Sequence, residues 1–462
     1  MFSISLPTKS SLLSKHRFLI LGGGLSGESA ARLLSKYGKT VILADQSEKV
    51  SSDSPYAKIV SDKNIEDALD LTECIIKSPG IPPTHPILLE AEKRNLIILS
   101  EIALGRIFYQ GPLVGITGTD GKSTTTALTH HLIRRHFPNS QVGGNLGLPF
   151  TSFCEDNLDM VVLELSSYQL EDSPNLHLSV SAITNLAPDH LERHKTMERY
   201  LLAKWKSNDL ENPNHTFIIG KKVWEKIPDK KQNYPGKILF FGEEKGSDIL
   251  IDFDSKKITT KNHSYDTNDF SLPGKHNLYN LALSIAISEA VGVPEEKTGS
   301  HLGDFEGLPH RFKKLNLKEK LNPSFQNIEF INDSKSTNLH SMLSGISGFR
   351  KEDSLFLILG GEPKEESLIP FFERWKELQN PVWIYGKAGK VWKEDFLRNK
   401  GDLSCEIVST VKDALVNIKT KMEPNKKQTI LFSPACASFD LYKNFSERGE
   451  DFERLISEIF GS

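Results

Sequence analysis

The sequence predicts an α/β protein built from three domains. Its 462 residues exceed the ~100 to 200 residues that one domain usually holds, so about three hydrophobic cores are expected. Short apolar runs alternate with amphipathic stretches along most of the chain, which is typical of parallel sheets covered by helices. We expect domains at residues 1–104, 105–309 and 310–462.

The first domain is expected to be Rossmann-like, because short apolar strands alternate with amphipathic helices along most of it. Gly38 can end the first of its helices, since glycine readily takes the left-handed conformation that follows a helix. The expected strands are 18–24, 40–45, 74–80 and 96–101, and the expected helices are 28–38 and 87–95.

The central and third domains repeat the alternation. The central domain is expected to have strands at 112–118, 160–167 and 180–186 and helices at 124–137, 197–209 and 277–292. Between Thr216 and Phe270 the short runs 238–242, 249–253 and 256–261 predict added antiparallel strands. The chain is expected to enter a second Rossmann-like domain near residues 307–312. Its expected strands are 355–361, 382–386 and 429–434, and its expected helices are 371–378, 390–397 and 413–422.

Composition and charge argue against several classes of protein. With 57 basic and 60 acidic residues the formal net charge is -3, so no global field favours nucleic acid or an anionic membrane. The four cysteines form no C-x-x-C pair, which disfavours a zinc site and a disulfide framework. The apolar run at 18–21 is too short for a signal peptide core, and no run approaches the ~20 residues that span a bilayer. We expect a soluble, cytoplasmic monomer that binds anions locally.

The most informative motif is a glycine-rich loop at Gly115–Thr124, which reads GITGTDGKST between an expected strand and an expected helix. Glycines let backbone N–H groups turn toward phosphate oxygens, and the helix N-terminus adds its positive end. Lys122 supplies a cation, and the Ser123 hydroxyl can coordinate Mg²⁺. The strict G-x-x-x-x-G-K-[ST] pattern would have glycine where this chain has Ile116, while Gly118 lies inside the loop. The alternative is a glycine-rich turn with a surface lysine.

The displaced glycine resembles the G-x-T-G-T-x-G-K-[ST]-T loop of the Mur ligases and of their relatives, the folylpolyglutamate synthetases and cyanophycin synthetase. Asp120 stands where these families more often have asparagine. The resemblance implies a P-loop ATPase-like central domain that binds ATP with two Mg²⁺ ions. The loop residues implied are Gly118, Thr119, Asp120, Gly121, Lys122, Ser123 and Thr124.

Two motifs that follow expected strands extend the resemblance to the D-glutamate-adding Mur ligases. Residues 164–170 read ELSSYQL, and Glu164 would need a partner if it were buried, although an isolated glutamate more commonly lies at an exposed strand end. Residues 185–194 read NLAPDHLERH and lie where α/β sheets place ligands. The resemblance implies that Glu164 and His190 are metal ligands beside Ser123, and that His190 also contacts D-glutamate. We expect no zinc, because His190 and His194 lack the H-E-x-x-H form.

Lys204 lies in the amphipathic segment 197–209, where a lysine by itself would be a solvated helix residue. The resemblance implies that this lysine is the one modified by carbon dioxide, giving an anionic metal ligand. Carbamylation needs a neutral amine, so the site would have to lower the lysine pKa through burial or neighbouring cations.

A second glycine-rich motif near the start of the chain has two interpretations. Residues 22–27 fit G-x-G-x-x-G between a strand and a helix, and Asp45 ends the next strand, which taken alone predicts NAD. The resemblance instead implies that this domain binds the uridine diphosphate of UDP-N-acetylmuramoyl-L-alanine. The substrate-binding residues implied are Leu25, Ser26, Asp45, Gln46, Ser47, Asn145 in the loop 143–149, and Ser166.

Motifs of the third domain follow in the family's order. HNLYN at 276–280, GLPHR at 307–311 and INDSK at 331–335 imply that Asn280, Arg311 and Asp333 complete the ATP site and that Lys335 assists phosphate transfer. A surface Arg–Asp pair and ordinary turns are the alternatives. Lysine and hydroxyl donors suit the two carboxylates of D-glutamate. The pocket implied consists of His190, Thr337, Lys364, Ser438, Phe439 and Phe445.

The resemblance implies an ADP-forming ligase of peptidoglycan precursor synthesis that adds D-glutamate through an acyl phosphate. The D-N-P-R string of relatives that add diaminopimelate or lysine is absent. Three alternatives stay open: another amino-acid-adding ligase or polyglutamate synthetase, an NAD-dependent dehydrogenase, and a non-catalytic nucleotide-binding module.

Overall fold

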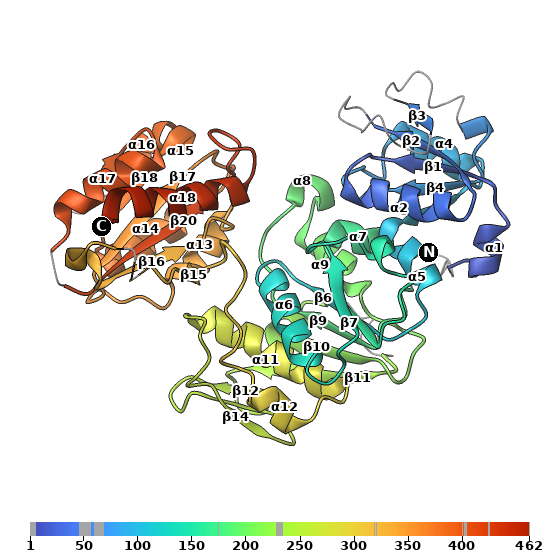
Figure 1. Ribbon diagram of the computed structural model, residues 1–462, viewed down its shortest axis with the longest axis horizontal. Coiled ribbons are helices and arrows are strands. Elements are labelled where there is room, and N and C mark those ends of the chain that lie inside the picture. Colours follow the sequence, from blue (N-terminus) through green and yellow to red (C-terminus); the bar gives the residue numbers. More distant parts are fainter. Residues whose placement is uncertain are drawn as a thin grey trace. The chain divides into compact units, whose positions relative to one another are not determined.

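The computed structural model describes residues 6–45, 57–59, 69–173, 175–227, 234–317, 319, 321–399, 401, 404–423 and 426–461. Within these residues the named strands form sheets of five, nine and six strands, each with helices packed on it (Figure 1). The chain divides into a first compact unit, Met1–Asn268 with Tyr279–Leu302, and a second, Asp269–Leu278 with Gly303–Ser462. The predicted α/β class is confirmed.

The five-stranded sheet is parallel throughout, as alternating strands and helices require. Its order is β3 (Ala57–Ile59), β2 (Thr40–Ala44), β1 (Arg17–Leu21), β4 (Cys74–Lys77), β5 (Ile97–Ser100). The helices of this part are α1 (Lys9–Leu13), α2 (Leu25–Lys36), α4 (Pro86–Lys93) and α5 (Glu101–Phe108). Gly38 has a φ of 68° and its N–H donates to Ser35 O, so it ends α2 as predicted.

In the nine-stranded sheet, the strand that leads into the glycine-rich loop is β6 (Leu113–Thr117). It lies between β9 (Val180–Ile183) and β8 (Met160–Glu164). Its order is β14 (Ser264–Asp266), β13 (Lys257–Thr259), β12 (Ile249–Asp252), β11 (Lys237–Gly242), β10 (Thr216–Gly220), β9 (Val180–Ile183), β6 (Leu113–Thr117), β8 (Met160–Glu164), β7 (Ser140–Gly144). Its helices are α6 (Lys122–Ile133), α7 (Ser167–Glu171), α8 (Leu191–His194), α9 (Met197–Trp205), α10 (Lys221–Trp224), α11 (Lys275–Ala290), α12 (Glu295–Gly299) and the 3₁₀ turn η2 (Phe150–Ser152).

The expected antiparallel addition is confirmed for one part of this sheet and wrong for another. β12 pairs antiparallel with β13, and β13 with β14. β11 instead pairs parallel with both β10 and β12. Each of the two connections on either side of β11 therefore returns the chain to the end of the sheet at which the preceding strand began.

The six-stranded sheet of the second unit is parallel except for its edge strand β15. Its order is β15 (Lys313–Lys314), β16 (Ile328–Asn332), β20 (Gln428–Ala435), β17 (Leu355–Gly360), β18 (Val382–Tyr385), β19 (Cys405–Ile407). Its helices are α13 (Leu339–Ile346), α14 (Ile369–Leu378), α15 (Gly386–Val391), α16 (Lys393–Asn399), α17 (Val411–Lys421), α18 (Phe445–Phe460) and the 3₁₀ turn η5 (Pro323–Phe325). No helix in the described parts of the chain is long and apolar enough to cross a membrane.

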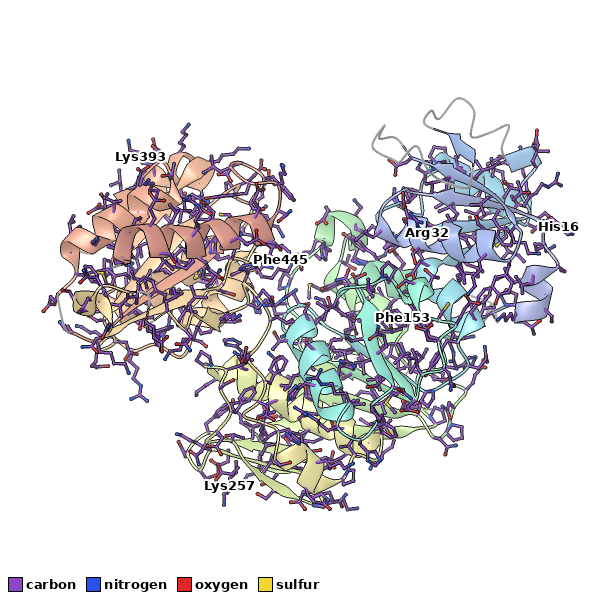
Figure 2. The ribbon with its side chains drawn as sticks, in the orientation of Figure 1. His16, Arg32, Phe153, Lys257, Lys393 and Phe445 are labelled. Carbon is purple, nitrogen blue, oxygen red and sulfur yellow. The ribbon has the colours of Figure 1, made fainter. Side chains whose placement is uncertain are left out.

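One hydrophobic core joins the five-stranded sheet to the nine-stranded sheet. The cluster holds Phe18 and Ile20 of β1 together with Val161 and Leu163 of β8. Phe153, whose side chain is labelled in Figure 2, packs in the same cluster, with its ring centroid 5.6 Å from that of Phe150. Burial of these apolar side chains in one cluster therefore stabilises the packing of the two sheets against each other.

Candidate active site

The glycine-rich loop joins the carboxyl end of β6 to α6, and its conformation depends on two glycines. Gly118 has a φ of 144°, and a Cβ there would stand 1.9 Å from Thr184 Oγ1. Gly121 has a φ of 76°, and a Cβ there would stand 2.4 Å from Asn280 Oδ1. Glycine is thus required at both positions by conformation and by space. The second contact also brings Asn280, predicted from a separate motif, against the loop.

Two polar residues that follow β9 hold the tip of the loop. Asn185 accepts from the Asp120 N–H through Oδ1 at 2.9 Å and donates to Asp120 O at 3.1 Å. The Thr184 hydroxyl donates to the same carbonyl at 2.6 Å. Neither residue was predicted to have a role in the site. The feature of the sequence that could have identified them is a hydroxyl and an amide side chain directly after a buried strand, at the same end of the sheet as the glycine-rich loop.

Lys122 is the first residue of α6, and its ammonium group lies over the loop. Nζ donates to Gly118 O at 3.0 Å and to Thr119 O at 2.5 Å. A cation held at the mouth of a glycine loop, beside a helix N-terminus, suits the terminal phosphates of a nucleotide.

A chain of hydrogen bonds connects three residues predicted from separate motifs. The Ser123 hydroxyl donates to Glu164 Oε2 at 2.5 Å, and Asn145 Nδ2 donates to Glu164 Oε1 at 2.7 Å. Glu164 is buried at the end of β8, so the interpretation that it lies at an exposed strand end is wrong. A hydroxyl and a carboxylate are the hard oxygen ligands that Mg²⁺ prefers, so Ser123 and Glu164 beside the glycine-rich loop fit the ion.

Lys204 is buried under the same loop. Its side chain is 1% exposed, and Nζ donates to Gly118 O at 2.6 Å and lies 4.2 Å from the Tyr200 ring centroid. Burial, followed by the charge of Lys122, lowers its pKa well below the usual value, against the opposing effect of nearby acids. The interpretation of Lys204 as a solvated helix lysine is therefore wrong. A buried, readily deprotonated amine is the form that carbamylation requires.

His190 and His194 lie in different surroundings. His190 has a φ of 54°, its side chain is 43% exposed, and its ring nitrogens lie 3.4 Å from Asp189 and 3.5 Å from Glu192. His194 is buried, with Nε2 2.9 Å from the Ser167 hydroxyl, and burial lowers its pKa. Among the described residues, no three His, Cys, Asp or Glu side chains form a group that could hold a metal ion.

The first glycine motif forms a tight loop at the carboxyl end of β1. Gly22 has a φ of 94°, and its carbonyl accepts from the Ser78 hydroxyl at 3.0 Å. The Gly23 N–H donates to Asp45 Oδ2 at 2.5 Å, so the acid predicted to contact a nucleotide lies against the loop. Leu25 is 78% exposed at the start of α2, next to Ser26. Gln46 and Ser47 lie outside the described residues.

Ser166 caps a short helix beside Glu164. It forms a capping box at the start of α7, in which its hydroxyl accepts from the Gln169 N–H and the Gln169 side chain accepts from the Ser166 N–H. The motif ELSSYQL therefore encodes the end of a strand and the first turn of a helix.

In the second unit, residues predicted from separate motifs also meet. Asp333 accepts from the Phe312 N–H at 3.0 Å and from the Ser433 hydroxyl at 2.7 Å. Phe312 directly follows Arg311 in the chain, so this hydrogen bond brings Asp333 to the GLPHR motif. Lys335 Nζ lies 4.4 Å from the ring centroid of Phe445, which is labelled in Figure 2. Of the other residues predicted for the pocket, Ser438 is buried, Thr337 is half-buried, and Lys364 and Phe439 are exposed.

Arg448 on α18 is a buried residue near the second unit's candidate residues that was not predicted from the sequence. Its guanidinium group is fully buried and donates to Cys436 O at 2.9 Å, Ala437 O at 3.2 Å and Ser334 O at 2.7 Å. It therefore holds the loop after β20 against the segment between Asp333 and Lys335. The available signal was an arginine among the apolar positions of an amphipathic helix.

Comparison with known proteins identifies the family. The Mur ligase middle domain matches residues 116–288. A UDP-N-acetylmuramoylalanine--D-glutamate ligase of Leptospira interrogans serogroup Icterohaemorrhagiae is 44% identical over 461 residues, which cover 96% of each chain. A ligase of the same name from Aquifex aeolicus is 31% identical over 449 residues, covering 96% of this chain and 99% of that one. The chain belongs to the Mur ligases.

Solved structures of Mur ligases share the fold. The UDP-N-acetylmuramate-alanine ligase MurC from Thermotoga maritima has a TM-score of 0.56 at 18% identity and covers 96% of this chain and 100% of that chain. The MurF ligase from the same organism, solved in complex with ADP, has a TM-score of 0.58 at 15% identity and covers 91% and 94%. Membership of this ligase family decides against the dehydrogenase suggested by the first glycine motif.

Proposed function

We propose that this Mur ligase joins D-glutamate to UDP-N-acetylmuramoyl-L-alanine in the cytoplasm, converting ATP to ADP and phosphate, in the synthesis of peptidoglycan precursors. The observation that carries the proposal is the 44% identity to a ligase of that name along 96% of both chains. The geometry supports it, because Lys122, Ser123, Glu164 and Lys204 converge on one glycine loop.

The reaction proceeds in two steps. The alanine carboxylate of the acceptor attacks the γ-phosphate of ATP, giving an acyl phosphate and ADP. The amine of D-glutamate then attacks the acyl carbon, and phosphate leaves as the amide forms. Lys122 neutralises charge on the phosphoryl oxygens, and the loop amides hold the remaining phosphates. Mg²⁺, which we propose as two ions, supplies further charge neutralisation when bound.

Ser123, Glu164 and His190 are the proposed metal ligands, together with a carbamate on Lys204. The neutral Lys204 amine attacks carbon dioxide, forms an N–C bond and releases a proton. The lowered pKa and the burial of Lys204 next to the loop support this chemistry. Asn280, Arg311 and Asp333 complete the proposed ATP site, and Lys335 assists phosphate transfer.

The two remaining substrate groups are assigned to the outer domains. Residues 1–104 bind the uridine diphosphate with Leu25, Ser26 and Asp45, while residues 105–309 bind ATP and supply Asn145 and Ser166 to the acceptor. Residues 310–462 bind D-glutamate through Thr337, Lys364, Ser438, Phe439 and Phe445. Substrates held by separate domains are typically brought together by closure.

A coupled assay of ADP formation tests the proposal. We expect ADP release only when UDP-N-acetylmuramoyl-L-alanine and D-glutamate are both present with ATP and magnesium. Each amino acid offered singly separates this activity from that of other amino-acid-adding ligases. Preference for L-glutamate, lysine or diaminopimelate would contradict the assignment, as would ADP release that is independent of the acceptor.

A further inference from the structure

Lys77 and Asp172 form a buried ion pair between the five-stranded sheet and the nine-stranded sheet. Lys77 is the last residue of β4, Asp172 follows α7, and Nζ donates to Asp172 Oδ2. The side chains are 1% and 17% exposed. Burial lowers the pKa of Lys77 and raises that of Asp172, so each charge is maintained mainly by the other.

Both residues lie next to parts of the candidate active site. Lys77 is in register with Leu21, which immediately precedes the first glycine loop, and it is followed by Ser78, which donates to Gly22 O. Asp172 terminates the short helix that begins directly after Ser166. One ion pair thus connects the loop proposed for the nucleotide of the acceptor with the segment that carries Glu164.

Hydrogen bonds of neighbouring residues join the same two parts of the chain. Ser100 of β5 is the register partner of Lys77, and its hydroxyl lies 2.5 Å from that of Ser173, which follows Asp172. Arg193, three residues after His190, donates to Glu171 at 3.0 Å and to Ile81 O at 3.3 Å. The carboxyl ends of β4 and β5 are therefore connected to the end of α7, and the segment after β4 is connected to the segment that carries His190.

A buried ion pair of this kind is weak support for stability. Removing two charges from water offsets much of their attraction, and well-packed apolar replacements are often neutral. What the pair does supply is a defined distance and direction between two segments. That property matters if one substrate must span both segments with its carboxylate in line with a phosphate.

We propose that Lys77 and Asp172 are a positioning pair for ligation, which fixes the glycine loop of the five-stranded sheet relative to Glu164 so that the acceptor carboxylate is aligned with ATP. This inference rests on the proposed function, in which the two ends of the acceptor lie in these two places. Neither residue is among those proposed to contact ATP or D-glutamate, so the expected effect of the pair is on alignment.

The kinetic test uses Lys77→Met, Asp172→Asn and the double variant, which keep side-chain shape and remove charge. We expect kcat per folded molecule to fall at least tenfold in each, with KM for ATP and D-glutamate within twofold of wild type. Each single variant leaves one buried charge without its partner and should lower the melting temperature, whereas the double variant should melt within a few degrees of wild type. Because the two residues act as one unit, the double variant should lose no more than either single variant. A melting temperature that falls while kcat per folded molecule is retained would overturn the proposal, as would multiplicative losses.

Lys36→Met is the matched control. Lys36 also bridges the two sheets, through Glu155 at 2.7 Å, but its side chain is exposed. Exposed ion pairs contribute little, so kcat should stay within twofold of wild type.

A distance measurement tests the pair independently of turnover. Spin labels at Arg32→Cys on α2 and Glu198→Cys on α9, with Cys405→Ser, report the separation of the two sheets by pulsed EPR. We expect one narrow distribution in the parent protein and a broader or shifted one in the double variant. An unchanged distribution would refute the positioning role. A wild-type protein that forms no ADP would refute the proposed function, and with it the role in ligation, while a distribution that broadens without the pair would still show that the pair sets the distance between the two sheets.

Discussion

Replacing Glu101 with glutamine tests how the burial of one carboxylate sets the pH dependence of stability. Glu101 begins α5, is buried, and accepts at Oε1 from the N–H of Thr151 at 2.6 Å and from its hydroxyl at 2.8 Å. Oε2 has no hydrogen-bond partner among the described residues. Burial raises the pKa of Glu101 to about 7, although the bonds from Thr151 act in the opposite direction.

The sign of the effect follows from the raised pKa. The folded chain prefers the protonated acid, so this side chain is least unfavourable below the ordinary pKa of 4.5. Stability is lost as the pH rises from 4.5 through about 7, and no further loss occurs above that. The difference between these two pKa values corresponds to about 3 kcal/mol, since one pKa unit is worth about 1.4 kcal/mol.

Thermal unfolding of wild type and Glu101→Gln between pH 4.5 and 8.5 measures this loss. Glutamine adds a buried NH₂ group whose cost does not depend on pH, so the change in the difference between the two proteins is the informative quantity. We expect wild type to lose about 3 kcal/mol relative to the variant across this range, or roughly 6 °C in melting temperature. Parallel curves over the whole range would refute the reasoning.

Three further substitutions test the candidate site. Lys122→Met should lower turnover by about 100-fold or more in the ADP assay, because it removes a cation from the phosphoryl oxygens, while the melting temperature stays close to wild type. Gly118→Ala places a Cβ 1.9 Å from Thr184 Oγ1 at a φ of 144°, so we expect a loss of about 1 to 3 kcal/mol in unfolding free energy and a raised KM for ATP. Lys204→Ala should abolish ADP formation, and small carboxylate ions should partly restore it if the carbamate is the missing group. No recovery with any of several such ions would count against the modified lysine.

Most of the strands and helices of the first unit are predicted from the sequence, because the patterns that mark them lie within a few consecutive residues. Alternation of apolar and amphipathic runs located the strands around Gly22 and Gly118, and the glycines marked the turns. β11 was assigned the wrong direction because a short apolar run has the same composition in a parallel and an antiparallel pair. Strand direction depends on how the connections return, which no local pattern specifies.

Lys204 shows where local pattern stops being informative. Lys204 and Lys206 are the same residue type two positions apart in one amphipathic segment, yet the first is buried under the glycine-rich loop and the second is exposed. Two positions along a helix turn the side chain by about 200°, so the two lysines must face opposite ways. Hydrophobic periodicity alone did not identify which of them faced the core, and only the family motif did.

The residues that escaped prediction share a physical property: each acts through partners far away in sequence. Arg448 satisfies carbonyl groups of the loop after β20 and of Ser334, more than 100 residues earlier, and Lys77 meets Asp172 across 95 residues. Such residues carry no motif of their own, because a buried charge is recognised by what surrounds it after folding. Burying such a charged residue is costly unless its partners are in place. Its contacts therefore form only when the distant segments have reached their final positions. Motifs therefore reveal the groups proposed to act on the substrates, whereas the contacts that set the distances between those groups emerge only from the folded chain.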